Sequence, residues 1–368
     1  MTHPLRILVS LWPGLGDIMF ATPAIRILRR KFPEAHIAAA LLDGGPGRAL
    51  LETNPNLNEI LVAPKGTAYS PRGIRDWTRR IRAEHYDVGI ELSFPVLWFL
   101  RLSGIPQRVR FGRRPFWWLV PYRDQRDRDL HASEHFLRAI DKLDGYSLRD
   151  DQGYDLVLTP EDEEKAEKII LDCSFRNADY GNQDSKTLIA IHPGARCNKN
   201  KRWDIMKFKE LCLRLAKGCK AGILILGGKD DVEAGEILVR ELASNSVEAH
   251  NLAGKLALRV TAAVAKRCRL YIGNDSGPIH IVSAVGTPIV SILASSNPGN
   301  FRPLAGTFRV LQPDAPCVGC FRFPGYMGLL WGLRLRWYNT CRAMETLAVD
   351  RVLSACRDLL ATGQDEKP

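Results

Sequence analysis

The chain has 368 residues, which is enough for two domains, and its hydrophobic and charged fractions of 45% and 25% exclude a disordered protein. Most of its net charge of +11 lies before residue 150, but no recognised nucleic-acid-binding module occurs, so we expect no nucleic-acid partner. The N-terminus has no signal-peptide pattern and no run reaches about 20 apolar residues, which predicts a cytoplasmic protein.

The basic first half indicates the class of partner that the sequence favours. Its arginines stand beside aromatic residues, as in RVRFGRRPFWWLVPYRDQR, and such a surface suits phosphorylated or anionic partners, acidic lipids included. An ordinary soluble protein of high pI explains the charge equally well. The nine cysteines are better explained as free thiols than as a disulfide framework.

Apolar runs alternate with helical patterns along the first half of the chain, which predicts parallel strands joined by helices. The expected strands lie near residues 5–10, 36–41, 59–62 and 88–92, and the expected helices include 23–31 and 72–84. A charged helix begins after the cap Thr159, with Pro160 at its first position and acids in its first turn. The polar stretch after it, SFRNADYGNQDSK, has the composition of a linker or long loop.

The same alternation restarts at TLIAIHPGA, a strand that ends in a Pro-Gly turn. It continues through the helix WDIMKFKELCLRLAKGC, the strand AGILILGG, the helix LRVTAAVAKRC, the strand, turn and helix LYIGNDSGPIHIVSAVG, and the strand TPIVSIL. Each of these two tandem arrays has its own glycine-bearing turn. The pattern therefore predicts an α/β protein with two Rossmann-like parallel-sheet domains that face an interdomain cleft.

The first glycine turn, GLGDIMF, follows the first strand at the edge of the sheet where open α/β folds bind ligands. Gly14 and Gly16 permit a tight turn, but Asp17 comes next and the third glycine of a dinucleotide fingerprint is missing. Because an uncompensated carboxylate repels phosphate, dinucleotide binding is disfavoured and Asp17 is a candidate proton acceptor. On base rates, a simple helix cap is the commoner role of such an aspartate.

The second glycine turn lies in GNDSGPIHIVSAVGTP, at the end of a buried strand. Asp275, Ser276 and Gly277 form a turn into a helix, whose first N–H groups and dipole favour an anion. His280 lies one turn into that helix. An ordinary N-cap above a packed histidine explains the same residues.

Cations follow the strand that ends at His192, in HPGARCNKNKRWDIMKF. They are candidates to bind a diphosphate, although such a charge run is more often a solvated loop; the four are Arg196, Lys199, Lys201 and Arg202. A further tight turn, LGGKDDVEAG, offers Asp230 or Asp231 to the hydroxyls of a ribose, and this signal is weak alone.

Over nearly its whole length, the chain resembles glycosyltransferase family 9, the ADP-heptose:lipopolysaccharide heptosyltransferases. The matching segments are GLGDIMFATPAIRILRRKFP, IHPGA with KRW, ILGGKDD, and NLAGKLAL leading to LYIGNDSGPIHIVSAVGTPIV. The resemblance implies a GT-B fold, with an acceptor-binding domain over residues 1–158 and a nucleotide-sugar-binding domain over residues 159–345. The amphipathic C-terminal segment 346–368 is a candidate to pack back on the first domain.

The resemblance also implies roles for these residues. Asp17, in the acceptor-side turn with Gly14 and Gly16, corresponds to the general base that deprotonates the acceptor hydroxyl as it attacks the anomeric carbon opposite the leaving ADP. The implied donor contacts are Lys201, Asp275, Ser276 and Gly277 on the diphosphate with His280 in support, Gly194 and Ala195 along its pocket, Asp230 on the ribose and Leu256 beside the adenine. No metal and no tightly bound cofactor is implied.

Two segments depart from the family pattern. The familiar K-x-W-P reads Lys201-Arg202-Trp203-Asp204, without the proline. Near the C-terminus, CVGCFRFPGYMGLLWGLRLRWYNTC contains cysteines whose first pair resembles half a zinc site, but structural thiols are the preferred interpretation; they are Cys317, Cys320 and Cys341. The aromatic and basic stretch between them suits lipid or acceptor, or an ordinary buried helix or loop.

Together these features predict an inverting transferase that moves heptose from ADP-heptose onto a lipopolysaccharide core or another anionic glycolipid. Its expected place is the cytoplasmic face of the inner membrane, with peripheral membrane contact. Another nucleotide sugar, a protein acceptor and a non-catalytic nucleotide-sugar-binding role stay open, because the sequence identifies neither the base nor the acceptor.

Overall fold

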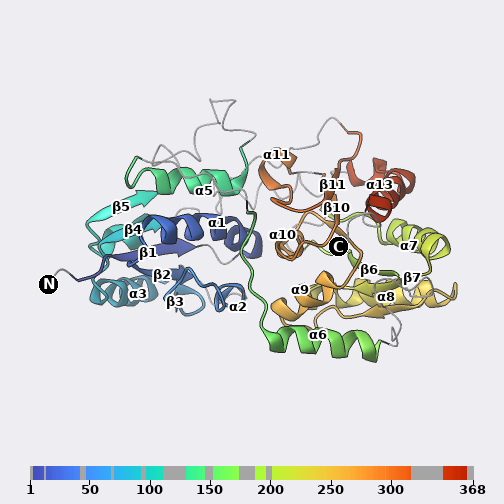
Figure 1. The fold of residues 1–368 in the computed structure, drawn as a ribbon, viewed down its shortest axis with the longest axis horizontal. Helices are drawn as coiled ribbons and strands as arrows, with labels where there is room; N and C mark the ends of the chain where they lie inside the picture. The colour runs from blue at the N-terminus through green and yellow to red at the C-terminus, as the bar shows by residue number, and fades with distance from the viewer. Residues whose placement is uncertain are drawn as a thin grey trace. The chain divides into compact units, whose positions relative to one another are not determined.

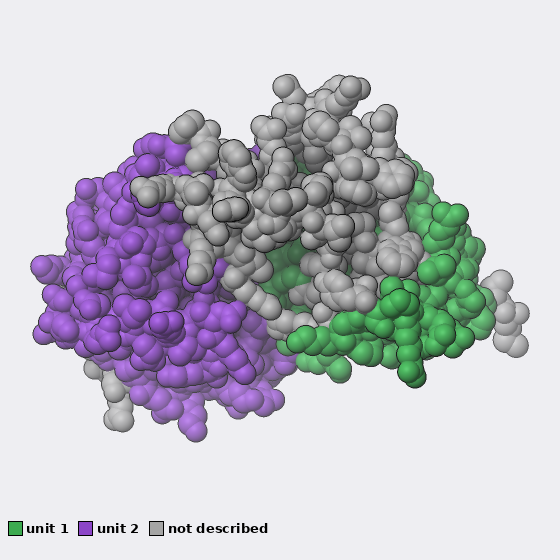
Figure 2. Space-filling model, turned by 180° about the vertical axis from the view of Figure 1, so that it is seen from behind, with its two compact units in different colours: residues 1–157, 324–326 green, residues 158–323, 327–368 purple. Residues whose placement is uncertain are grey.

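The structure is a computed structural model that describes most of the chain. The described residues are 3–11, 14–41, 47–67, 70–92, 97–110, 130–145, 152–173, 187–195, 201–294, 296–315 and 343–362, without the side chains of 97–99 and 110. The chain divides into two compact units, which Figure 2 colours separately. Unit 1 comprises residues 1–157 with 324–326, and unit 2 comprises residues 158–323 and 327–368.

Unit 1 contains a five-stranded parallel sheet in the order β3-β2-β1-β4-β5. Its strands are β1 (Arg6–Leu11), β2 (His36–Leu41), β3 (Glu59–Val62), β4 (Val88–Glu91) and β5 (Gln107–Arg110). Its helices are α1 (Leu15–Lys31), α2 (Arg48–Leu51), α3 (Pro71–Ala83), α4 (Leu97–Leu102) and α5 (Ala132–Asp141). The central strand β1 is buried from its second residue onward, as expected of a strand covered on both faces.

Helix α1 begins eight residues before the predicted start at Pro23, so Pro23 lies inside the helix. A proline there has no N–H for the carbonyl four residues earlier, which belongs to Met19. The hydroxyl of Thr22 donates to that carbonyl instead, over 2.8 Å. The helix therefore continues through the proline with this acceptor satisfied.

Unit 2 contains a six-stranded parallel sheet in the order β11-β10-β9-β6-β7-β8. Its strands are β6 (Thr187–His192), β7 (Ala221–Ile225), β8 (Ala249–Asn251), β9 (Leu270–Asn274), β10 (Ile289–Ile292) and β11 (Phe308–Leu311). Its helical segments are α6 (Pro160–Asp172), α7 (Ile205–Cys219), η5 (Lys229–Asp231), α8 (Val232–Ala243), α9 (Leu258–Lys266), α10 (Gly277–Ala284), α11 (Pro298–Phe301), η6 (Ala343–Thr346) and α13 (Val349–Thr362).

Helices cover both faces of the sheet of unit 2 (Figure 1). Successive side chains of β6 point to opposite faces, so Ile189 and Ile191 join a core with α7, α8 and α13, while Leu188 and Ala190 join a core with α6, α9 and α10. The apolar runs read from the sequence are thus strands buried on both sides, which is the doubly wound arrangement.

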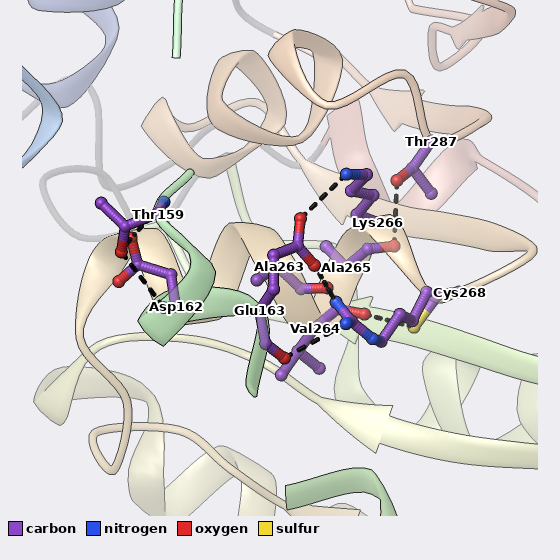
Figure 3. Close-up of polar contacts among 10 residues, drawn as sticks. Thr159, Asp162, Glu163, Ala263, Val264, Ala265, Lys266, Cys268 and Thr287 are labelled. Carbon is purple, nitrogen blue, oxygen red and sulfur yellow. Dashed lines mark hydrogen bonds and ion pairs between the residues drawn. The ribbon is translucent and has the colours of Figure 1, made fainter. Parts of the chain in front are cut away.

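The first helix of unit 2, α6, is bonded to α9 (Figure 3). Thr159 caps α6 in a reciprocal capping box with Asp162, and Arg259 donates to Asp162 over 2.8 Å. Glu163 accepts from Lys266 over 2.8 Å and also pairs with Arg267. Burial alone raises the pKa of both acids, but these donors and cations bring each pKa below its usual value.

The C-terminal helix α13 packs on unit 2, against α7, β10 and β11, instead of returning to the first domain. Its apolar face holds Val352, Leu353 and Cys356 against the core of unit 2. Asp350 on the same helix accepts from Arg214 of α7 over 2.6 Å. The apolar stripe therefore has its partner in unit 2, which accounts for the difference from the sequence expectation.

Each sheet reverses its strand order once beside its first strand: between β1 and β4 in unit 1, and between β6 and β9 in unit 2. Open α/β sheets bind ligands outside the carboxyl ends of the strands at such a switch point. The fold thus marks one edge in each unit as the place to look for chemistry.

Candidate active site

At the switch point of unit 1, the chain leaves β1 and enters α1 through the predicted glycine turn. Gly14 is the N-cap with extended backbone, and the N–H of Ile18 donates to its carbonyl over 3.0 Å. Gly16 and Asp17 lie in the first turn of the helix. Asp17 is therefore the third helical residue, so the cap position belongs to a glycine.

Asp17 is half-buried, and desolvation by burial raises the pKa of its carboxyl to about 6, against a smaller opposite effect of its own backbone N–H. It makes no ion pair with any residue that the structure describes. At neutral pH such a carboxylate is still largely ionised, and it is a stronger base than an ordinary aspartate. These are the properties required of a general base.

A second acid at the same edge of the sheet was not singled out from the sequence. Glu91 is the last residue of β4, pairs in register with Ser10 of β1, and is 2% exposed. The sequence feature that could have identified Glu91 is an acidic residue at the end of a buried strand, in VGIE. The switch point of unit 1 thus carries two acidic side chains.

At the switch point of unit 2, Lys201 is fixed by two side chains. Its Nζ donates to Asp275 Oδ2 over 2.6 Å and to Ser296 Oγ over 2.9 Å, and Ser296 also donates to Asp275. Asp275 is 6% exposed. The carboxylate of Asp275 therefore holds the ammonium of Lys201 at the carboxyl end of β9.

A second group of polar residues joins β6 to β9. His192 ends β6, and its Nε2 lies 3.3 Å from Asp231 Oδ2 while its Nδ1 lies 3.2 Å from Ser276 Oγ. Asp231 also accepts from the N–H of Gly228 over 2.9 Å. Burial raises the pKa of Asp231, but other effects outweigh it and leave that pKa below its usual value. These effects are the hydrogen bond and charge of His192, the Gly228 N–H and the charge of Arg202.

Gly194 is required by the close approach of Asp231. A Cβ added at Gly194 would lie 1.9 Å from Asp231 Oδ1. The neighbouring Ala195 is buried, and its carbonyl accepts from Arg202 Nε over 3.3 Å. The Pro-Gly turn after β6 is thus shaped around a carboxylate.

Asn274, buried at the end of β9, ties this turn to the lysine segment. Its Oδ1 accepts from the N–H of Trp203 over 3.0 Å, and its Nδ2 donates to the carbonyl of Pro193 over 2.7 Å. Asp204 caps α7 by accepting from the N–H of Met206 over 2.7 Å. An aspartate N-cap therefore begins α7 where the familiar motif has a proline.

Ser276 is the N-cap of α10, but its hydroxyl contacts His192 and the carbonyl of Asn274 instead of capping the helix. Serine at this position ordinarily accepts from the second or third N–H of the helix. Gly277 begins the helix and His280 is buried within it, 3% exposed. The start of α10 therefore presents backbone donors beside a fixed lysine, a combination suited to an anion.

Comparison with known proteins identifies the family of this chain. The family model for glycosyltransferase family 9 (heptosyltransferase) matches residues 74–328, which is more than half of the chain. The chain belongs to glycosyltransferase family 9. It is therefore a glycosyltransferase, as the motif resemblance predicted.

Curated relatives of this family 9 chain agree. It is 26% identical over 317 residues to lipopolysaccharide heptosyltransferase 2 of Salmonella typhimurium, covering 84% of this chain and 88% of the relative. It is 25% identical over 304 residues to lipopolysaccharide heptosyltransferase 3 of Escherichia coli, covering 78% and 82%.

Solved structures confirm the GT-B fold. A glycosyl transferase of family 9 from Veillonella parvula matches with a TM-score of 0.77 at 22% identity, over 98% of this chain and 99% of that one. The ADP-heptose heptosyltransferase II of E. coli matches with a TM-score of 0.71 at 19% identity, over 98% and 100%. At this identity, the likeness concerns the fold alone.

The structure brings some of the predicted site residues together and separates others. Lys201 and Asp275 pair at the end of β9, and the next residue, Ser276, contacts His192, with Gly194 and Ala195 in the turn after β6. Asp230 is exposed, whereas the adjacent Asp231 is the buried partner of His192. Leu256 is half-buried against the α6–α9 core of unit 2.

Other predicted features lie outside the described residues: Arg196, Lys199, Cys317, Cys320, Cys341 and the aromatic stretch between these cysteines. In the part of the chain that the structure describes, no three or more His, Cys, Asp or Glu side chains group as metal ligands. Within the same part, no helix is both long and apolar enough to span a membrane.

Proposed function

We propose that this enzyme transfers heptose from ADP-heptose, with inversion, onto a lipopolysaccharide core or related anionic glycolipid. Unit 1 would bind the acceptor and unit 2 the nucleotide sugar. The activities for which its relatives are named, lipopolysaccharide heptosyltransferases 2 and 3, support the choice of sugar and acceptor. The enzyme would act at the cytoplasmic face of the inner membrane, where such a glycolipid and a soluble nucleotide sugar are both accessible.

Asp17 is proposed as the general base. An inverting displacement needs one group to take the proton of the acceptor hydroxyl while that oxygen attacks the anomeric carbon. The raised pKa of about 6 and the lack of an ion partner among the described residues both support this role. The carbon–oxygen bond to the diphosphate breaks as the new glycosidic bond forms, and the proton passes to Asp17.

Lys201 and the start of α10 are proposed to bind the departing diphosphate. As the leaving group departs, negative charge grows on its oxygen atoms, and preorganised cations and N–H donors stabilise that charge. The single observation that carries this assignment is the fixed position of Lys201, held over 2.6 Å by a 6%-exposed Asp275. Asp275 would keep the ammonium in place, while Ser276, Gly277 and His280 line the same anion site.

Calorimetric titration with ADP, UDP and GDP tests the donor assignment. We expect ADP to bind most tightly and Lys201→Ala to weaken it on the order of tenfold to a hundredfold, the value of one or two charge-assisted hydrogen bonds. Lys209→Ala is the matched control, because Lys209 also pairs with a carboxylate in unit 2, Glu241, over 2.7 Å. It should leave ADP affinity unchanged.

The outcomes separate the alternatives. A preference for UDP would keep the reaction type and overturn the donor. Undetectable binding of all three nucleotides would reject the donor site. ADP binding without transfer from ADP-heptose to deacylated lipopolysaccharide core would favour a non-catalytic nucleotide-sugar-binding protein.

A further inference from the structure

The proposed reaction assigns no role to Asp231 and His192, which form a contact chain with Ser276. Its two links span 3.3 Å and 3.2 Å, and it connects η5 through the end of β6 to the first residue before α10. Asp231 and His192 are 6% and 3% exposed. A histidine held between a carboxylate and a hydroxyl in this way controls which atom receives the hydroxyl proton.

The carboxylate fixes one side of the imidazole. The pKa of Asp231 is below its usual value, so its carboxylate is ionised and only accepts hydrogen bonds. His192 must therefore carry a proton on Nε2, the nitrogen that faces Asp231. Its Nδ1 faces Ser276, so the contact with the hydroxyl depends on whether that nitrogen carries a proton.

The two protonation states of His192 orient Ser276 differently. When Nδ1 is unprotonated it accepts the hydroxyl proton, and the serine then presents only oxygen lone pairs to a ligand. When Nδ1 is protonated it donates to Ser276 Oγ, and the hydroxyl proton turns to another acceptor. In the unliganded protein that acceptor is the carbonyl of Asn274, 3.2 Å away, and a phosphate oxygen would replace it.

Charged and titratable groups on several elements act on the Asp231–His192 pair or lie at the same edge of the sheet. Asp231 on η5 favours the imidazolium, whereas Arg202, whose charge acts on Asp231, opposes it. Tyr271 on β9 stays neutral, since burial and the charge of Asp231 raise its pKa well above the usual value. The opposite charges of Lys201 and Asp275, paired at the end of β9, largely cancel one another. A bound diphosphate would add negative charge to this set and favour a proton on Nδ1.

We propose that His192, held by Asp231, is a positioning residue of the donor site, and that binding of a nucleoside diphosphate is coupled to uptake of a solvent proton at its Nδ1. The proton turns the hydroxyl of Ser276 toward the phosphate. This inference rests on the proposed function, because it places the diphosphate at the start of α10.

Calorimetry of ADP binding in buffers of different ionisation enthalpy measures the protons taken up. The terminal phosphate of ADP titrates in the same pH range, so the informative quantity is the difference between wild type and His192→Gln. Between pH 6.5 and 8, wild type should take up more protons per ADP, by a substantial fraction of one, and bind ADP about tenfold more tightly at the lower pH. His192→Gln should show neither that extra uptake nor that pH dependence.

His36→Gln is the matched control, because His36 Nε2 also lies 3.3 Å from a carboxylate, that of Glu59, in unit 1. Its proton uptake should equal that of wild type. Ser276→Ala serves as a second variant should His192→Gln fold poorly, and it should flatten the pH dependence of ADP affinity.

The failures are distinguishable. If ADP does not bind the wild-type protein, the proposed function falls. If ADP binds and the proton uptake of His192→Gln matches that of wild type, the donor site stands and the role of His192 is rejected.

Discussion

The two switch points have the same topology but opposite electrostatic designs. In unit 1, Asp17 follows the first strand with no ion partner among the described residues, and burial raises its pKa to about 6. In unit 2, Asp231 and Asp275 are each held by a donor or cation, and the pKa of Asp231 is lowered. The difference teaches that burial and partners move the pKa of a carboxylate at a parallel-sheet edge in opposite directions, which suits one acid to a base and the other to a support.

The largest expected effect is that of replacing Asp17. Asp17→Asn should lower kcat on the order of 10²- to 10⁴-fold, the usual contribution of a general base, and leave ADP affinity unchanged. In wild type, kcat/KM should rise with pH through an apparent pKa of about 6. Steady-state kinetics and calorimetry check both statements, with the exposed Asp76→Asn as control. Normal turnover by Asp17→Asn would remove the contrast between the two edges.

The next prediction concerns the close packing of Gly194 against Asp231 in unit 2. Gly194→Ala should weaken ADP binding about tenfold or more and lower the free energy of unfolding by about 1–3 kcal/mol, because its Cβ would overlap the Asp231 carboxylate. Gly218→Ala is the control, since a Cβ there meets nothing within 4 Å in the helical α7. That change should stabilise the protein by up to about 1 kcal/mol. Calorimetry and urea unfolding would show whether the turn tolerates the methyl group.

The last prediction compares how the stability contributions of the two acids depend on pH. Because the pKa of Asp17 is raised, its ionised form lowers the free energy of unfolding above pH 6. Asp17→Asn should therefore raise that free energy by at most about 3 kcal/mol above pH 6, and this gain should vanish below about pH 4. A lowered pKa means the reverse for Asp231: Asp231→Asn should destabilise by about 2–3 kcal/mol at neutral pH, with the loss shrinking as pH falls below 4. Urea unfolding at pH 3 and pH 7.5 measures both, and changes of the same sign for the two variants at pH 7.5 would contradict the comparison.

Much of the fold followed from the sequence because parallel strands buried on both faces leave continuous apolar runs. The predicted strands at residues 36–41 and 59–62 agree with β2 and β3. The polar edge strand β5, with the sequence QRVR, has no such run and was not predicted. The start of α1 was misjudged because the hydroxyl of Thr22 replaces the N–H that Pro23 lacks.

The sequence indicates neighbouring candidate residues most directly where they lie in one turn. Gly14, Gly16 and Asp17 form such a turn, as do Asp275, Ser276 and Gly277. His192 and its partner Asp231 are 39 positions apart in the sequence. Which of the adjacent residues Asp230 and Asp231 is buried against His192 depends on which side chain of the single turn η5 points inward. Sequence periodicity does not resolve that choice in so short an element.

The packing of the last helix has a consequence for how the protein is made. The indole N–H of Trp203, next to the proposed diphosphate-binding lysine, donates to the carbonyl of Leu347 over 3.1 Å, and α13 completes the core around it. During synthesis the N-terminal region emerges first and can begin to fold. The core behind the lysine segment, by contrast, stays incomplete until α13 has emerged from the ribosome. A truncated product without α13 would therefore carry a formed β1–α1 turn but an incomplete nucleotide-binding unit.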